Sequence, residues 1–294
     1  MAAKPLKGAP VAKAITEACA RDIAALCGKG TVPRLAIVRV GAREDDLAYE
    51  RGIARLFTSA GASAEVHKLP GDAWQCALER VVASLNDDPR VHGVLLFRPL
   101  PGHLSEERIK GLIMPSKDID CMSHANAAAV FEGDASGHPP CTPKAVMELL
   151  SFYGIALAGK KVAVVGRSLV VGRPLAMMLM SQDATVTLCH TKTRDLAGEC
   201  RRSDIIVCCA GKPRMLGADA VRPGQVVIDV GINMSGGKLC GDADYDAAQG
   251  VVDAITPVPG GVGAVTASIL LMNTVRSAAA CSSGHWEPPA CSSE

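Results

Sequence analysis

The fold is decided by residues 161–174, which read KVAVVGRSLVVGRP. The run 161–165 is β-branched and apolar, as in a buried parallel strand. Gly166 opens a turn that ends at Gly172, and Pro174 suits the first turn of a following helix, where a missing N–H costs nothing. A strand that leads through such a turn into a helix presents backbone amides to a phosphate group. Because the spacing G-x-S-x-x-x-G differs from G-x-G-x-x-G, the turn alone also fits a generic strand-to-helix connection.

The same alternation of strand-like and helix-like segments continues on both sides of this stretch, which is typical of parallel sheets with crossover helices. Residues 133–142, rich in Gly, Pro and small polar residues, separate the two halves of the chain. We therefore expect a two-domain α/β fold, with an N-terminal α/β domain, a Rossmann-type dinucleotide-binding domain in the second half and the last helix packing back on the first domain. The expected strands are 35–40, 64–69, 93–97, 161–165, 185–189, 204–210 and 225–230, and the expected helices are 47–60, 74–85, 143–153, 175–181 and 266–280.

The composition is that of an ordinary soluble globular protein. The chain has 294 residues, 48% of them hydrophobic and 21% charged, with a formal net charge of +1. This small charge argues against a nucleic acid or a membrane surface as partner. No apolar run reaches the roughly 18 residues of a membrane span, and the start lacks a signal-peptide core. The 12 cysteines include no C-x-x-C pair, so we expect reduced thiols in a cytoplasmic protein and no metal site.

The end of the second strand of the Rossmann domain indicates which nucleotide is bound. NAD sites usually place an acidic residue there to hold the ribose 2′-hydroxyl. Residues 189–193, CHTKT, contain no carboxylate, and Arg167 lies in the preceding glycine turn. A basic surface with hydroxyl groups favours a 2′-phosphate. We therefore expect NADP, with Arg167 as the stronger candidate for the phosphate and Thr191 as a second one.

A second glycine-rich segment, residues 256–266, reads TPVPGGVGAVT. Its three glycines allow the backbone to approach a ligand closely, and it leads directly into a helical run. Taken alone, it fits an ordinary tight connection equally well.

With these segments in place, the chain resembles the methylenetetrahydrofolate dehydrogenase/cyclohydrolase family over residues 1–280. The resemblance implies oxidation of 5,10-methylenetetrahydrofolate to 5,10-methenyltetrahydrofolate with NADP, in one-carbon metabolism, by a homodimer formed through the cofactor domain. It divides the chain into a folate-binding catalytic domain (1–143, completed by helix 266–280) and an NADP-binding domain (144–265). The tail 282–294 has Ser, Gly and Pro without periodicity, so we expect it to be disordered. The matching segments are, in chain order, 40–49, 98–101 (RPLP), 117–120 (KDID), 140–143 (PCTP), 166–174, 211–213 (GKP), 227–233 (VIDVGIN), 241–242 (GD) and 256–266.

The resemblance also implies the site residues. Tyr49 would stack on the folate ring system and Asp120 would hydrogen-bond the pterin, whose edge presents adjacent N–H donors. The loop 259–263 would line a cleft near nicotinamide and folate. The implied catalytic and substrate-binding residues are Tyr49, Asp120, Pro259, Gly260 and Gly261, and the implied cofactor-binding residues are Gly166, Arg167, Ser168, Gly172, Thr191 and Ile232.

The chain departs from the family on the folate side. The second family reaction, hydrolysis of methenyltetrahydrofolate, uses a lysine one helical turn after the tyrosine and a glutamine on a nearby strand. Ile53 and Phe97 stand at those positions, and neither side chain can carry a proton. Cys121 replaces a glycine, Ala264 a proline and Arg98 an apolar residue. We therefore expect a dehydrogenase whose cyclohydrolase activity is lost or weakened.

Three alternatives remain open at this point. A divergent paralogue would bind NADP and act on another pteridine-like or amine substrate. A degenerate paralogue would bind NADP or folate without turnover. A different two-domain Rossmann dehydrogenase would explain the turn 166–172, but neither the KDID segment 117–120 nor the loop 257–263.

Overall fold

The computed structural model describes residues 2–282 and divides them into two compact units. Unit 1 consists of residues 2–14 and 127–269, and unit 2 of residues 15–126 and 270–282. Residues 2–14 and 127–143 belong to unit 1, whereas the sequence predicts them in the first domain. Ser282 is the last residue of a helix, and the rest of the predicted tail, 283–294, lies outside the described residues. The chain passes between the units within three helices: α1 (Gly8–Cys27), α5 (His124–Glu132) and α10 (Thr266–Ser282).

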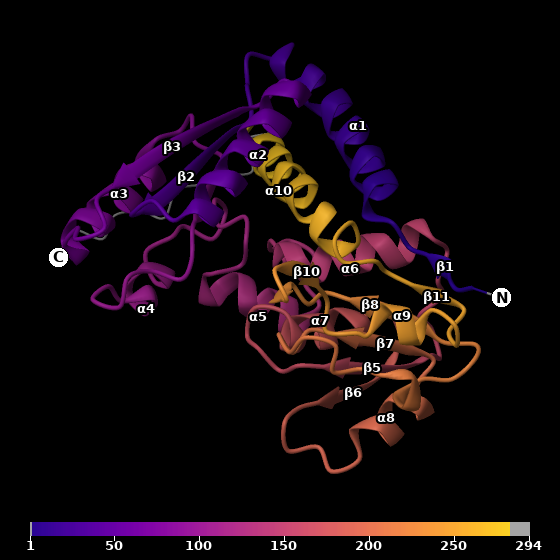
Figure 1. Cartoon of the computed structure of the whole chain (residues 1–294). Coiled ribbons are helices and arrows are strands. Elements are labelled where there is room, and N and C mark those ends of the chain that lie inside the picture. The colour runs from indigo at the N-terminus through magenta and orange to yellow at the C-terminus, as the bar shows by residue number, and fades with distance from the viewer. Residues whose placement is uncertain (1, 283–294) are drawn as a thin grey trace. The chain divides into compact units, whose positions relative to one another are not determined.

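Unit 1 is built on a six-stranded, entirely parallel sheet (Figure 1). Its order is β1-β11-β8-β7-β5-β6, so β5 lies between β6 and β7. If the strands β5, β6, β7, β8 and β11 are numbered 1 to 5 along the chain, their order from the β6 edge is 2-1-3-4-5. In such open sheets, ligands bind outside the carboxyl ends of the strands, where the strand order reverses. The strands are β1 (Lys4–Pro5), β5 (Lys161–Val165), β6 (Thr185–Cys189), β7 (Ile205–Cys208), β8 (Val226–Asp229) and β11 (Ala254–Ile255).

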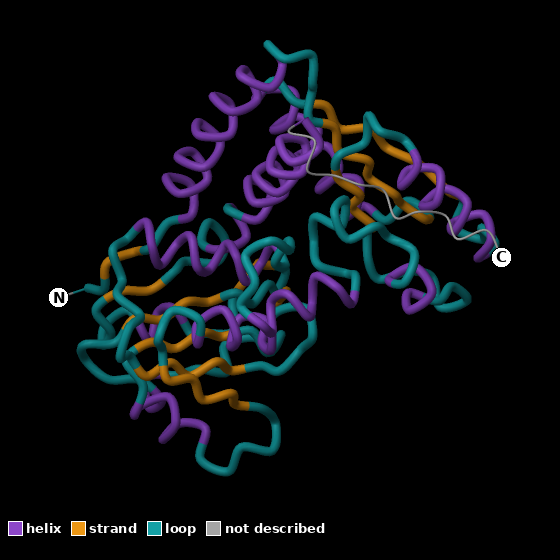
Figure 2. The backbone as a smooth tube through the Cα atoms, turned by 180° about the vertical axis from the view of Figure 1, so that it is seen from behind, coloured by secondary structure: helices purple, strands orange, loops and turns teal. Residues whose placement is uncertain are grey.

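Helices cover this sheet, as Figure 2 shows in purple beside the orange strands. A short antiparallel hairpin follows β8. The four predicted strands of this half are confirmed, with β7 and β8 shorter than expected at their ends. The remaining elements are α6 (Cys141–Phe152), α7 (Gly172–Met180), α8 (Leu196–Arg202), α9 (Tyr245–Ala248), the hairpin strands β9 (Asn233–Ser235) and β10 (Lys238–Cys240), and the 3₁₀ turns at Ala218–Ala220 and Val262–Ala264.

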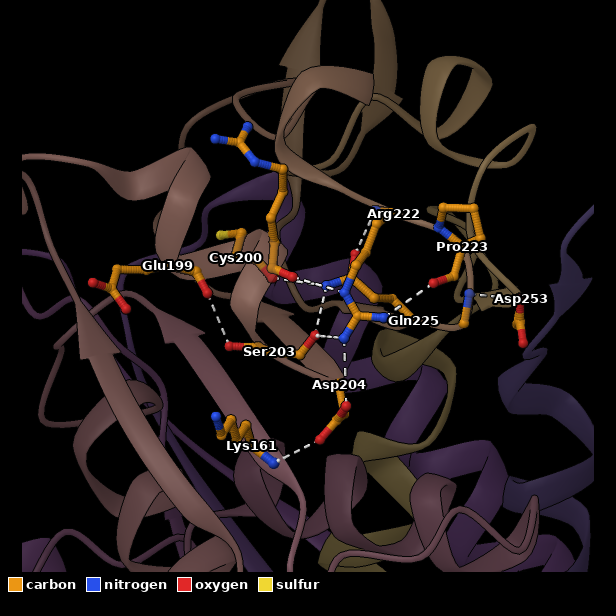
Figure 3. Close-up of polar contacts among 11 residues, drawn as sticks. Lys161, Glu199, Cys200, Ser203, Asp204, Arg222, Pro223, Gln225 and Asp253 are labelled. Atoms are coloured by element: carbon orange, nitrogen blue, oxygen red, sulfur yellow. Dashed lines mark hydrogen bonds and ion pairs between the residues drawn. The ribbon is translucent and has the colours of Figure 1, made fainter.

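A buried polar network holds the amino-terminal edge of this sheet (Figure 3). The side-chain nitrogen of Gln225 donates hydrogen bonds of 2.7 Å to the backbone carbonyl groups of Cys200 and Ser203. Its side-chain oxygen accepts a hydrogen bond from the backbone amide of Arg222. The Arg222 guanidinium donates to the carbonyl groups of Arg201 and Ser203. These contacts satisfy carbonyl groups that the end of α8 leaves unpaired. These hydrogen bonds stabilise the amino-terminal edge of the sheet, whereas ligands are expected at the carboxyl-terminal edge.

Unit 2 contains a three-stranded parallel sheet of order β3-β2-β4. Its core consists of apolar side chains from β2, β4 and α3, including Val38, Leu78 and Val94. The last helix packs on this unit, as predicted, because Asn273 of α10 donates a 2.8 Å hydrogen bond to the carbonyl of Ile119. The elements are β2 (Arg34–Val40), α2 (Glu44–Ala60), β3 (Ser63–Leu69), α3 (Gln75–Asp87), β4 (Gly93–Leu96) and α4 (Glu106–Lys110).

Among residues 2–282, no helix is long and apolar enough to cross a bilayer. In the same range, no group of three or more His, Cys, Asp and Glu side chains could hold a metal ion, and the cysteines form no disulfide.

Candidate functional site

The glycine turn after β5 occupies the point where the strand order reverses. A Cβ atom on Gly166 would lie 2.3 Å from the carbonyl oxygen of Cys209, directly after β7, and Gly166 has a φ of +136°. A Cβ atom on Gly172 would lie 2.1 Å from the carbonyl oxygen of Gly166. Both positions therefore exclude a side chain, so the start of α7 packs directly on the end of β5. This is the close backbone arrangement that a dinucleotide pyrophosphate requires.

Ser168 and Arg167 have different roles in this turn. The Ser168 hydroxyl accepts hydrogen bonds from the amides of Val171 (3.1 Å) and Gly172 (3.4 Å), which shapes the entry to α7. The carbonyl of Arg167 accepts a 3.2 Å bond from the guanidinium of Arg173, and the Arg167 side chain is exposed. Arg167 is therefore positioned through its backbone, and its charge faces solvent.

The end of β6 carries no acidic ligand for a ribose. The amide of Gly166 donates to the carbonyl of Cys189 (3.0 Å), so the ends of β5 and β6 lie together. In the following loop, the Thr193 hydroxyl accepts from the amide of His190 (2.9 Å), and Thr191 is exposed. The first carboxylate after β6 is that of Asp195, which accepts from the amide of Gly198 at the start of α8. This surface suits a 2′-phosphate better than a bare ribose hydroxyl.

A cavity of ≈ 290 Å³ lies within unit 1, next to the end of β8. It is lined by residues 229–232, Leu239 and residues 257–264. The cavity wall therefore includes Ile232 and the predicted loop residues Pro259, Gly260 and Gly261.

Close packing explains the glycines of this loop. Gly260 has a φ of +101°, and a Cβ atom on Gly261 would lie 2.5 Å from the carbonyl oxygen of Pro257. A Cβ atom on Gly8, at the start of α1, would lie 2.1 Å from the carbonyl oxygen of Gly261. The amide of Gly8 also donates to the carbonyl of Gly260 (2.8 Å). The loop is therefore fixed against the first turn of α1.

In unit 2, an aromatic pair stands where the resemblance predicts the ring clamp. The Tyr49 and Phe97 rings stack with centroids 5.7 Å apart and planes inclined by 30°. Tyr49 is 40% exposed, whereas Phe97 is buried and Ile53 is fully buried. The two positions predicted to have lost the hydrolytic groups are thus filled by apolar side chains, one of them in contact with Tyr49.

The lysine of the KDID segment, residues 117–120, binds backbone groups. The Lys117 ammonium is buried and donates to the carbonyl groups of Leu85, Asn86 and Asp88 at the end of α3. Burial lowers the pKa of this lysine.

The acidic residues of the segment differ from each other. The carboxylate of Asp118 is buried and accepts from the amides of Met122 and Ser123. Asp120 is partly exposed and forms an ion pair with Arg98, with 3.2 Å between Oδ2 and Nη2. Cys121 has a φ of +57°, a conformation that favours glycine, and burial raises the pKa of its thiol to about 12. Lys117 and Asp118 thus hold the turn, while Asp120 is the member that a ligand can reach.

Two family models match the chain, one in each half. The catalytic domain of tetrahydrofolate dehydrogenase/cyclohydrolase matches residues 6–120, and the NAD(P)-binding domain of the same family matches residues 140–282. The chain belongs to the tetrahydrofolate dehydrogenase/cyclohydrolase family.

Relatives in this family are similar over nearly their whole length. The chain is 48% identical to the bifunctional protein FolD of Carboxydothermus hydrogenoformans over 277 residues, which cover 93% of this chain and 96% of the relative. The crystal structure of FolD from Campylobacter jejuni is 39% identical, with a TM-score of 0.92 and coverage of 95% and 99%. The Trypanosoma brucei FolD structure, complexed with NADP cofactor and an inhibitor, is 36% identical, with a TM-score of 0.89 and coverage of 95% and 98%.

Sequence reasoning missed a pair of buried carboxylates that organises the family's loops in unit 1. The fully buried carboxylate of Asp242 accepts hydrogen bonds of 2.6–2.9 Å from the amides of residues 210–212 and from the side chain of Asn233. The family segments 211–213, 227–233 and 241–242 therefore meet at one side chain. An acidic residue inside each of two glycine-bearing segments was the available signal.

Asp229 is the second buried carboxylate, and it lies at the cavity. It accepts from the amides of Gly231 (3.0 Å), Asp242 (3.0 Å) and Ala243 (2.8 Å). Burial raises the pKa of Asp229 to about 6, although the three amides act in the opposite direction. The pair fixes the backbone on both sides of Ile232.

Proposed function

We propose that this chain oxidises 5,10-methylenetetrahydrofolate to 5,10-methenyltetrahydrofolate with NADP⁺. The observation that carries the proposal is the turn of Gly166 and Gly172 at the strand-order reversal, with exposed Arg167 beside a strand end that has no carboxylate. Membership of the tetrahydrofolate dehydrogenase/cyclohydrolase family supports it, as does the NADP in the Trypanosoma brucei relative.

Unit 1 would hold the cofactor. Amides of the turn from Gly166 to Gly172 would bind the pyrophosphate, with Ser168 shaping the turn, and Arg167 and Thr191 would bind the 2′-phosphate. Bound NADP⁺ supplies a hydride acceptor. Ile232, on the rim that Asp229 fixes, and the loop at Gly260 would shape the adjoining cavity.

Unit 2 would hold the folate. Tyr49 offers an exposed aromatic face, and Asp120 offers a carboxylate to the N–H donors of the pterin. The oxidation moves a hydride and gives no proton to a protein group, so these side chains contribute binding and orientation rather than acid–base chemistry.

The test is oxidation of methylenetetrahydrofolate with NADP⁺ and NAD⁺ in parallel. We expect turnover with NADP⁺ and a KM for NADP⁺ raised about 10- to 100-fold by Arg167→Gln, since a charge-assisted contact is lost. The KM for NAD⁺ should hardly change. Arg202→Gln, which removes an exposed arginine paired with Glu199 in α8, is the matched control. Binding of NADP and folate without turnover would contradict the proposal and favour a degenerate paralogue.

We also propose that the cyclohydrolase activity is lost or weakened. Hydrolysis of the methenyl bridge needs a group that moves protons while water attacks. Ile53 and Phe97 have no such group, and the Phe97 ring packs on Tyr49 where a polar side chain would be needed. The arginines at 51 and 55 lie two residues away on an α-helix, and arginine stays protonated.

Hydrolysis of methenyltetrahydrofolate, followed by its absorbance, tests this second proposal. The rate with the protein should equal or only slightly exceed the rate in buffer, and clear enzyme-dependent hydrolysis would overturn the proposal. The double variant Ile53→Lys, Phe97→Gln should gain measurable hydrolysis. Because Ile53 is fully buried, each single variant is the control: a lone lysine there lacks its hydrogen-bonding partner.

The remaining expectations follow from the family rather than from a contact in the structure. We propose a cytoplasmic homodimer formed through the cofactor domain, a folate-binding domain at 1–143 completed by α10, and an NADP-binding domain at 144–265. Light scattering coupled to size-exclusion chromatography tests the dimer, and a monomer at assay concentration would contradict it.

A further inference from the structure

Arg98, the ion-pair partner of Asp120, has no role in the proposed oxidation. Nη2 of Arg98 lies 3.2 Å from Oδ2 of Asp120, and each side chain is 23% exposed. Glu106 lies 4.0 Å from the Nε atom of Arg98, too far for a hydrogen bond. A guanidinium has five N–H donors, so Arg98 keeps donors available beyond its bond to Asp120.

Both members of the pair are held in place through their backbones. The carbonyl of Arg98 accepts a 3.1 Å hydrogen bond from the Arg43 guanidinium. On the other side, the carbonyl of Ile119 accepts from Asn273, and the buried Asp118 carboxylate fixes the turn. The pair is therefore positioned before any ligand binds, which is what a specificity contact requires.

The hydrogen-bonding pattern of the pair is specific. A carboxylate only accepts hydrogen bonds and a guanidinium only donates them, so the two side chains together present an acceptor beside a donor. The complementary ligand edge is an N–H beside a carbonyl, as in a cyclic lactam. A 4-oxo pterin has such an edge at N3–H and C4=O. A 4-amino pterin presents a lone pair at N3, which would face the carboxylate, and an amino group at position 4, which would face the guanidinium. Neither arrangement can form a hydrogen bond.

We propose that Arg98 is a specificity-determining residue that reads the 4-oxo group of the pterin while Asp120 accepts from N3–H. The inference rests on the proposed function, since it takes Asp120 as the pterin anchor. Exposed Tyr49 supports this placement, because its ring packs on Phe97, the residue directly before Arg98. The ion pair is partly exposed, so water can reach Asp120 when Arg98 is replaced, and the variant should stay folded.

The test compares two pteroylglutamates that differ only at position 4, oxo or amino. We expect the wild-type chain to bind the 4-oxo compound at least about tenfold more tightly, because the 4-amino compound leaves polar groups unpaired. Arg98→Met, which keeps the stem and removes the donors, should reduce this preference to less than about threefold. Arg98→Lys, which restores a donor, should show an intermediate preference. Arg108→Met, which removes an exposed partner of Glu79 in the same unit, is the matched control and should keep the preference.

Calorimetric binding is the readout, so the outcome does not depend on turnover. A wild-type chain without a preference, or an Arg98→Met variant that keeps it, overturns the inference. If the chain shows the predicted preference but does not oxidise methylenetetrahydrofolate, the proposed activity fails while the role of Arg98 stands. In the active enzyme, Arg98→Met should raise the KM for methylenetetrahydrofolate about tenfold with kcat nearly unchanged, as loss of a uniform binding contact requires.

Discussion

Ionisation of Asp229 should make the stability of this protein depend on pH in an unusual direction. The pKa of Asp229 is about 6 in the folded chain against 3.8 for an ordinary aspartate, and burial is the main cause. The unfolded chain therefore loses this proton first as the pH rises. Between about pH 4 and pH 6 the folded state binds more protons than the unfolded state, so this group makes stability fall as the pH rises. At about 1.4 kcal/mol per pKa unit, the loss is about 3 kcal/mol.

Asp229→Asn removes this ionisation and tests the reasoning. Urea unfolding of the wild type and the variant, between about pH 4 and pH 8, gives the free energy of unfolding of each at every pH. Asparagine has one acceptor oxygen for the three amides at this position, so the variant should be less stable at low pH. The deficit should shrink by about 3 kcal/mol towards pH 7. Asp246→Asn, at an exposed position of the same unit, is the control. Parallel pH profiles for the wild type and Asp229→Asn would refute the assigned cause.

Three further outcomes follow from single contacts. Gly172→Ala should weaken NADP binding at least about tenfold, because the new Cβ atom would lie 2.1 Å from the carbonyl of Gly166; a fluorescence titration with an unchanged Kd would contradict this. Gln225→Ala should lower the free energy of unfolding by about 2–4 kcal/mol in urea, since buried hydrogen bonds to Cys200 and Ser203 are lost. Its kcat/KM should stay within about twofold of the wild type, because the network lies at the amino edge of the sheet, and a selective loss of activity would argue against that separation. Lys117→Met should lower the free energy of unfolding by about 2–3 kcal/mol, because it leaves carbonyl groups at the end of α3 unpaired. An unchanged thermal unfolding temperature would contradict this and would show that water replaces the ammonium.

The parallel sheets were predictable from the sequence because their signal is local. Buried strands such as β2 and β5 read as short β-branched runs, and the helices between them are amphipathic. The two-residue strands β1 and β11 carry no such pattern and exist because Lys4 pairs with Ala254 across the folded chain. The helix α1 was not predicted, although the buried residues Ile15, Cys19 and Ile23 recur at helical spacing within its 20 residues.

Some residues of the candidate site could be assigned from the sequence, and others could not. Gly166 and Gly172 predict a close backbone approach from the sequence. In the structure, a Cβ atom at either position would collide with a backbone carbonyl group. The carboxylate of Asp242 could not be assigned, because its partners lie 9 to 32 residues away in the chain. Lys117 and Asp118 belong to a segment that carries the family resemblance, and in the structure both side chains bind backbone groups.

The sequence by itself determined the order of the main strands, the glycine positions and the apolar residue types at Ile53 and Phe97. These are properties of residue type and spacing, so no folded context is needed to read them. Only the tertiary structure decided that Phe97 stacks on Tyr49, that Arg98 pairs with Asp120 and that burial raises the pKa of Asp229. Each of these depends on which groups are brought together and on how much water is excluded, and neither quantity is encoded in local spacing.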